Sequence, residues 1–147
     1  MKEAKPRIYC DTCVYIDRFC HRRGRDGRNL EKEADLLFTH VLKGEYTLLV
    51  SNFVLEELKA PRSEKFQDFN YQEFQNLELL LTPHMEYIKY NTSDKEMAMK
   101  RKPDNWKDAL HVTIAEKSNA DYLVTQNLKD YVLINTKIKV VPPLYLC

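Results

Sequence analysis

The chain has 147 residues, of which 44% are hydrophobic and 31% charged, and its 23 basic residues nearly balance its 22 acidic ones. This size and balance are typical of one globular domain, and they exclude a fibre, a disordered tail and two full domains. A formal net charge of +1 gives a weak overall field, so local basic clusters must hold any polyanionic partner.

Hydrophobic periodicity predicts strands that alternate with helices along the chain. The expected strands are residues 7–11, 47–50, 85–90, 122–125 and 138–141. The expected helices are residues 30–41, 52–60, 63–81, 93–101 and 105–118, with Ser93 and Glu96 at the spacing of a capping box. No linker or repeat divides the chain, so residues 1–147 are expected to form a single α/β domain, with a mostly parallel central sheet and helices on both faces.

No apolar run reaches the roughly 18 residues of a membrane span, and no signal peptide precedes the first strand, so we expect a cytoplasmic protein without a membrane segment. Reduced cysteines are expected in a chain of this length. Cys10-x-x-Cys13 followed by Cys20-His21 permits a thiol or zinc chemistry. We disfavour both, because Cys10 falls inside a strand and Cys20 and His21 are adjacent rather than spaced as zinc ligands.

Polar side chains are expected to meet beyond the carboxyl ends of the parallel strands, where such sheets bind ligands. Four acids are predicted there: Asp11, Glu57, Asp108 and Asp130. Glu57 falls on the apolar side of its helix, whereas Glu56 falls on the opposite side and is expected to be solvated. Asn127 follows the 122–125 strand and adds an amide oxygen.

Several carboxylates in one place repel each other unless a cation lies among them. An all-oxygen acidic pocket suits Mg²⁺ or Mn²⁺ better than zinc, and such an ion can activate water against a phosphodiester. Individually the acids have simpler explanations. Asp108 can cap its helix together with Asn105, Asp11 can be a turn residue, and Asp130 can be a loop residue.

Four segments carry a family resemblance: residues 8–17 (IYCDTCVYID), 51–58 (SNFVLEEL), 108–112 (DALHV) and 121–131 (DYLVTQNLKDY). In this order they resemble the motifs of PIN-domain ribonucleases, most closely the VapC-type toxins of toxin–antitoxin pairs. The resemblance implies a metal-dependent endoribonuclease with a protein antitoxin as partner. It implies catalytic roles for Asp11, Glu57, Asp108 and Asp130, ligation of one or two Mg²⁺ or Mn²⁺ ions by Asp11, Asp108, Asp130 and Asn127, and supporting hydroxyls from Thr12 and Thr125.

Two positions depart from the family pattern. The family commonly has Asn where this chain has Cys13, and often an acid where it has Asn127. These departures leave a second interpretation open, a non-catalytic PIN-like module that binds RNA or protein through a degraded metal site.

Two basic clusters are candidates for holding the RNA backbone. They comprise Arg18, Arg22, Arg23, Arg25 and Arg28, and then Lys100, Arg101 and Lys107. The first cluster has a simpler explanation as a solvated loop. An apolar stripe of Phe66, Phe69, Phe74 and Leu77 is expected in the core. Where part of it is exposed, the family resemblance implies that an antitoxin or a second copy of the chain (a homodimer) covers it.

Overall fold

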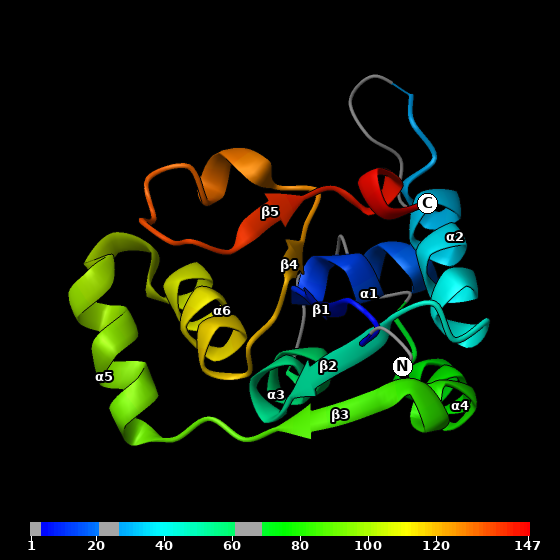
Figure 1. Cartoon of the computed structure of the whole chain (residues 1–147), viewed down its shortest axis with the longest axis horizontal. Helices are drawn as coiled ribbons and strands as arrows, with labels where there is room; N and C mark the ends of the chain where they lie inside the picture. The colour runs from blue at the N-terminus through cyan, green and yellow to red at the C-terminus, as the bar shows by residue number, and fades with distance from the viewer. Residues whose placement is uncertain (1–3, 21–26, 61–68) are drawn as a thin grey trace.

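The computed structural model describes residues 4–20, 27–60 and 69–147. Its centre is a five-stranded sheet in the order β3-β2-β1-β4-β5, in which every neighbouring pair is parallel (Figure 1). The strands are β1 (Arg7–Cys10), β2 (Thr47–Ser51), β3 (Met85–Ile88), β4 (Tyr122–Val124) and β5 (Lys139–Val141). The expected α/β fold with a parallel sheet is confirmed.

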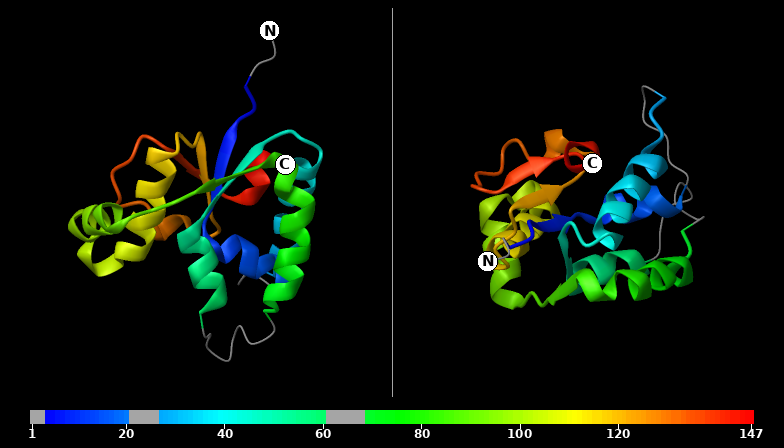
Figure 2. Two further views of the ribbon diagram at one scale, coloured as in Figure 1. Left: turned by 90° about the horizontal axis from the view of Figure 1, so that it is seen from below. Right: turned by 45° about the vertical axis from the view of Figure 1, so that its right-hand side comes forward.

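Six α-helices surround the sheet in the part of the chain that the structure describes. They are α1 (Thr12–Phe19), α2 (Leu30–Leu42), α3 (Asn52–Lys59), α4 (Tyr71–Leu81), α5 (Thr92–Arg101) and α6 (Trp106–Lys117). Short 3-10 turns are η2 (Thr82–His84), η3 (Pro103–Asn105), η4 (Leu128–Asp130) and η5 (Pro143–Leu146). The pair α5 and α6 lies on one side of the sheet, whereas α1, α2 and α4 contact each other on the other side (Figures 1 and 2).

Helices on both faces explain the composition of the central strands. Ile8, Tyr9 and Cys10 of β1 are all fully buried, as are Leu48 and Leu49 of β2. A strand covered on both faces by helices needs a continuous apolar run rather than alternation. None of the four cysteines, all within the described ranges, forms a disulfide. None of the described helices is both long enough and apolar enough to cross a bilayer.

Polar caps set the beginnings of the helices. The Asn29 side chain accepts a hydrogen bond from the Lys32 amide at 3.1 Å at the start of α2. The predicted capping box of α5 was wrong by two residues, because Asn91 and Asp94 have the same spacing and form the box instead. Ser93 therefore lies inside the first turn of α5.

Most element boundaries lie within two residues of the prediction. The amide of Tyr90 donates to the Asn52 side chain at 2.9 Å, and β3 ends at Ile88 rather than at residue 90. The described part of the predicted 63–81 helix is α4, which begins after the cap Asn70. Residues 63–68, including Phe66 of the apolar stripe, lie outside the described residues. Phe74 is buried in the core as expected.

The strand order creates a switch point beside β1. From β1 the chain adds β2 and β3 on one side, and it then crosses over to add β4 and β5 on the other side. The carboxyl ends of β1 and β4 therefore flank the crevice in which open parallel sheets bind ligands. Asp11 and Thr125 are the residues that follow these two strands.

Candidate active site

Asp11 is a buried carboxylate at the switch point, only 4% exposed. It caps α1 through Oδ1, which accepts a hydrogen bond from the Cys13 backbone amide at 2.9 Å. Its other oxygen, Oδ2, accepts from the Thr125 hydroxyl at 2.8 Å and from the Tyr131 hydroxyl at 2.9 Å. These three donors hold the carboxylate through neutral groups and add no positive charge.

Asp108 lies in the first turn of α6 and converges on the same hydroxyl. Its Oδ1 accepts from Tyr131 at 3.3 Å, and its Oδ2 accepts from the Asn105 amide at 2.7 Å. Asn105 is the N-cap residue of α6, but its side chain makes no capping bond and binds this acid instead. Burial raises the pKa of Asp108, the Asn105 bond opposes that rise, and repulsion by Asp11 adds to it.

Glu57 is half-buried on α3 and binds the side chain of Thr12, which directly follows Asp11. We call the site formed by Asp11, Asp108 and Glu57 the acidic cleft. Its Oε1 accepts from the Thr12 hydroxyl at 2.5 Å and lies 2.9 Å from His111 Nε2. Burial alone raises the pKa of Glu57, but the His111 and Thr12 bonds outweigh burial and lower the pKa overall. The neighbouring Glu56 is exposed, as predicted.

A chain of buried hydrogen bonds supports Glu57 from behind. The Tyr9 hydroxyl lies 2.7 Å from His111 Nδ1 and 2.8 Å from the Ser51 hydroxyl. If Ser51 donates to Tyr9, Tyr9 to Nδ1, and Nε2–H to Glu57, a neutral imidazole satisfies every group in the chain. This arrangement fixes the orientation of the His111 ring and, through it, the position of Glu57.

The segment after β4 contributes the remaining predicted residues. Thr125 is fully buried and bridges Asp11 to the backbone, because its hydroxyl also accepts from the Asn127 amide at 3.0 Å. The thiol of Cys13 lies 3.6 Å from the same hydroxyl. Asp130 is exposed, and its backbone carbonyl accepts a hydrogen bond at 3.3 Å from the Asn105 side chain that also binds Asp108. It therefore lies at the rim of the site, where its charge adds to the raised pKa of Asp108.

The structure brings Asp11 and Asp108 together, places Glu57 beside them through Thr12, and leaves Asp130 and Asn127 at the edge. Within residues 4–20, 27–60 and 69–147, no three His, Cys, Asp or Glu side chains are close enough to form a metal cage on their own. The oxygen-only donors of Asp11 and Asp108 nevertheless fit Mg²⁺ or Mn²⁺, which bind through one or two carboxylates, waters and substrate phosphates.

The predicted basic residues differ in their surroundings. Three arginines are paired with carboxylates: Arg18 with Glu31 and Asp35, Arg28 with Glu33, and Arg101 with Glu116.

Lys107 lies 5.9 Å from the centre of the Trp106 ring, and its charge helps to lower the pKa of Glu57. Lys100 is exposed, whereas Arg22, Arg23 and Arg25 lie outside the described residues. Lys107 is therefore the candidate cation that the structure places at the acidic cleft.

The sequence analysis did not predict three contacts of this site. These are the bonds from Tyr131 to Asp11, from His111 to Glu57 and from the Asn105 amide to Asp108. His111 follows Asp108 by three positions and therefore shares its helix face, which is a signal that could have been used. Tyr131 directly follows Asp130, but its burial depends on contacts with Asp11 and Asp108, which are distant in the sequence.

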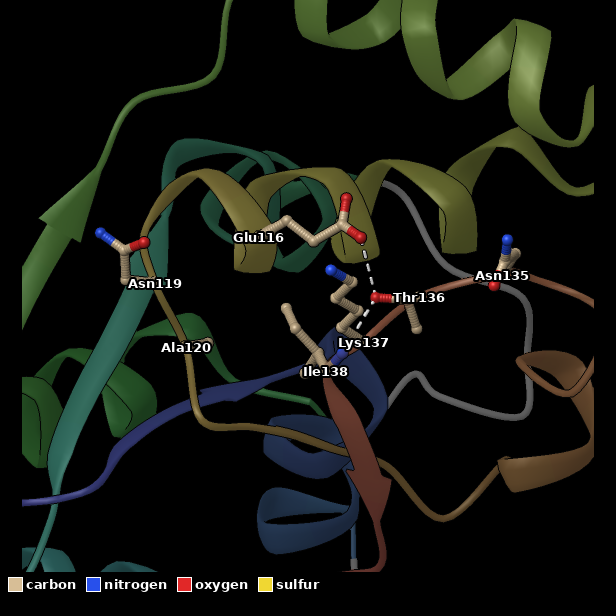
Figure 3. Close-up of a pocket in the computed structure, with 7 residues that line it drawn as sticks. All are labelled: Glu116, Asn119, Ala120, Asn135, Thr136, Lys137 and Ile138. Carbon is tan, nitrogen blue, oxygen red and sulfur yellow. Dashed lines mark hydrogen bonds between the residues drawn. The ribbon is translucent and has the colours of Figure 1, made fainter.

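A separate cavity of about 520 Å³ lies at the far end of α6 (Figure 3). Its lining includes Glu116, Asn135, Thr136 and Lys137. Glu116 is about 12 Å along the helix from Asp108, and its carboxylate is occupied by Arg101 and by Thr136. This cavity is therefore distinct from the acidic cleft.

Comparisons with known proteins give one family model and several solved structures of similar fold. The model of the PIN domain matches residues 7–129. The fold is similar to VapBC2 from Rickettsia felis bound to a promoter DNA fragment, with a TM-score of 0.55, 16% identity, and coverage of 92% of this chain and 96% of that one. FitAcB from Neisseria gonorrhoeae gives a TM-score of 0.57 at 13% identity, covering 94% of this chain and 99% of that one. FitAB bound to the IR36 DNA fragment gives 0.57 at 11% identity, with coverage of 92% and 94%.

No curated protein shows a significant match. The structural neighbours share too little sequence identity to establish more than the fold. The family match is different, because it covers most of the chain and includes Asp11, Glu57 and Asp108. The chain belongs to the PIN domain family.

Proposed function

We propose that this chain is a divalent-metal-dependent endoribonuclease that hydrolyses RNA phosphodiester bonds, with Mg²⁺ or Mn²⁺ as its cofactor. One observation carries the proposal. Asp11 and Asp108, which are far apart in the sequence, both accept a hydrogen bond from the Tyr131 hydroxyl at the switch point of the sheet. Membership of the PIN domain family supports this proposal, because such domains are generally nucleases.

Asp11 and Asp108 would hold the ion, with Asp130 and Asn127 completing the site from its rim. A bound divalent ion polarises a phosphate oxygen and lowers the pKa of a bound water. Glu57 stays ionised beside the site, since His111 and Thr12 lower its pKa, and it can accept a proton from an attacking water. Thr12 and Thr125 orient Glu57 and Asp11 through their hydroxyls.

The RNA strand is proposed to run past the start of α6. The ammonium groups of Lys95 and Lys107 lie 5.1 and 5.9 Å from the centre of the Trp106 ring. Within the described residues neither lysine forms an ion pair, so both charges are free to meet phosphates. Lys107 also acts electrostatically on Glu57, which connects this basic surface to the acidic cleft.

We further propose that the enzyme is the toxin of a toxin–antitoxin pair. The four motifs resemble VapC-type toxins, and the fold is similar to those of VapBC2 and FitAB. Exposed apolar side chains are available for a protein partner, including Val132 at 76% and Leu133 at 78% exposure. An antitoxin or a second copy of this chain would cover such residues.

The test is cleavage of total cellular RNA by the purified protein with Mg²⁺ or Mn²⁺, beside a sample with excess EDTA. Cleavage is expected with metal only and should disappear in Asp11→Asn. Glu57→Gln and Glu56→Gln form a matched pair on one helix, of which only the first should impair cleavage. Equal activity in EDTA, or full activity in Asp11→Asn, would contradict the proposal.

A non-catalytic RNA- or protein-binding module is the second candidate. Cys13 and Asn127 favour it, together with the lack of a three-ligand cage among the described residues. An ion that binds the folded state raises the midpoint of thermal unfolding. If millimolar Mn²⁺ leaves this midpoint unchanged, the binding module becomes the better interpretation.

A further inference from the structure

Tyr131 places its hydroxyl between the two carboxylates that the proposed function assigns to the metal. Its oxygen is 2.9 Å from Asp11 Oδ2 and 3.3 Å from Asp108 Oδ1. We propose that this hydroxyl occupies the place of the shared ion in the metal-free protein and must leave it before an ion binds both acids. Tyr131 would thereby weaken metal binding while stabilising the metal-free fold. This inference rests on the proposed function.

The hydrogen bonds of the two carboxylates show why Tyr131 is the group to be displaced. Asp11 Oδ1 is held by the Cys13 amide and Asp108 Oδ2 by Asn105. These donors lie at helix starts, and each binds the carboxylate oxygen that Tyr131 does not contact. Tyr131 is the donor that the two carboxylates share, so an ion bridging them would compete with it directly.

A neutral hydroxyl cannot replace an ion in charge. The phenol carries one hydrogen and can donate it fully to one carboxylate at a time. The hydroxyl is the donor in both contacts, to Asp11 and to Asp108, so it carries its proton there. It links the two acids but leaves both negative charges in place. A divalent ion neutralises them and is therefore the stronger occupant.

The surroundings of the ring give it a place to move. Tyr131 is only 3% exposed, but it lines a cavity of about 300 Å³ together with Leu128, Ile134, Ile138 and Val140. The next two residues, Val132 and Leu133, are largely exposed and pack little against the core. A rotation of the ring toward this cavity would withdraw the hydroxyl without opening the sheet.

The test uses Tyr131→Phe, which removes the hydroxyl and keeps the ring. The dissociation constant for Mn²⁺ is measured from the electron paramagnetic resonance of the free ion, without RNA. Because hydrogen bonds to the carboxylates no longer need to be broken, binding should become about tenfold tighter. In EDTA the same variant should unfold at a lower temperature than the wild type, because Asp11 and Asp108 lose their shared donor.

Tyr46→Phe is the matched control. The Tyr46 hydroxyl donates to the Leu146 carbonyl at 2.7 Å near the amino end of β2, away from the acidic cleft. Its loss should lower the unfolding temperature and leave the Mn²⁺ dissociation constant unchanged. Asp11→Asn should greatly weaken Mn²⁺ binding in both the wild-type and the Tyr131→Phe background.

The outcomes distinguish the role of Tyr131 from the existence of the metal site. If the wild type binds Mn²⁺ and Tyr131→Phe binds it equally or more weakly, the displacement role of Tyr131 is wrong while the metal site stands. If neither protein binds millimolar Mn²⁺, both the metal site and the role of Tyr131 are overturned. Tighter binding in Tyr131→Phe alone, with Tyr46→Phe unchanged, supports the inference.

Discussion

The two ends of the sheet both carry acids, but they compensate them differently. At the amino end Glu86 pairs with the Arg7 guanidinium at 2.7 Å, and Asp121 accepts from the Arg7 amide at 2.8 Å. At the carboxyl end Asp11 and Asp108 accept only neutral donors among the described residues. These donors are hydroxyls, a side-chain amide and one backbone amide.

This difference indicates which acids serve the fold and which serve a ligand. A carboxylate that already has an arginine gains little from a further cation. A buried carboxylate held by neutral donors has no cation to offset its charge. Burial first, and then repulsion by Asp11, therefore raises the pKa of Asp108. The carboxyl end is therefore the one prepared to receive a cation.

Replacing one acid at each end of the sheet should give the largest difference in the rate of RNA cleavage. Asp108→Asn should lower the rate of RNA cleavage more than about a hundredfold, since even losing an outer-shell partner of a metal ligand costs about 10- to 100-fold. Glu86→Gln removes a surface ion pair and should leave the cleavage rate unchanged. Initial rates on one oligoribonucleotide with Mn²⁺ measure both, and a similar loss in the two variants would contradict the distinction.

Substitution of His111, which binds Glu57, should have the next largest effect on the rate of cleavage. His111→Leu removes the Nε2 donor and should reduce cleavage about tenfold or more, as expected for a positioning residue behind an active-site carboxylate. His111→Gln can still donate to Glu57 and should recover part of the activity. Circular dichroism confirms that each variant is folded. A failure of Gln to exceed Leu would assign His111 a role in packing alone.

The acids of the site could be predicted from sequence because their positions follow from topology. Asp11 follows a buried strand, and Asp108 begins a helix whose start faces the same edge of a parallel sheet. The topology alone places these two acids together, since the carboxyl ends of parallel strands meet at one edge of the sheet.

The partners of these acids could not be predicted in the same way. Asn105 has the sequence signature of a helix cap but donates to Asp108 instead, a choice that depends on the three-dimensional position of η3. Arg101 appeared to be free for RNA, yet it pairs with Glu116 on the packed helix α6. Contacts between elements decide which charges are available, and local spacing does not encode them.

The basic surface at α6 should give a smaller, salt-dependent effect. In an Asp11→Asn background with EDTA, Lys107→Gln should reduce the slope of log binding constant against log salt by about 0.7 for single-stranded RNA, equivalent to one lost phosphate contact. Lys137→Gln, at the cavity on the other end of α6, is the control and should leave the slope unchanged. Fluorescence anisotropy of a labelled oligoribonucleotide provides the measurement, and equal slopes for all three proteins would remove Lys107 from the interface.

The smallest expected effect is an opposite response of structural and site acids to pH. Burial raises the pKa of Glu116, but hydrogen bonds from Arg101 and Thr136 lower it overall. Its stabilisation is therefore present above its ordinary pKa and is lost as pH falls through the lowered value. The pKa of Asp108 is raised, mainly by burial, so its contribution is most favourable at low pH and is lost as pH rises through the raised value.

Thermal unfolding in EDTA from about pH 3 to about pH 7 should show the two signs. Relative to the wild type, Glu116→Gln should become less stable as pH rises, whereas Asp108→Asn should become more stable, each by a few degrees at neutral pH. Added Mn²⁺ should reverse the second difference, because the wild type then gains a cation that the variant cannot hold as well. Parallel slopes for the two variants would mean that Asp108 is compensated in the same way as the acids at the amino end, and the case for a cation at the carboxyl end would lose its electrostatic basis.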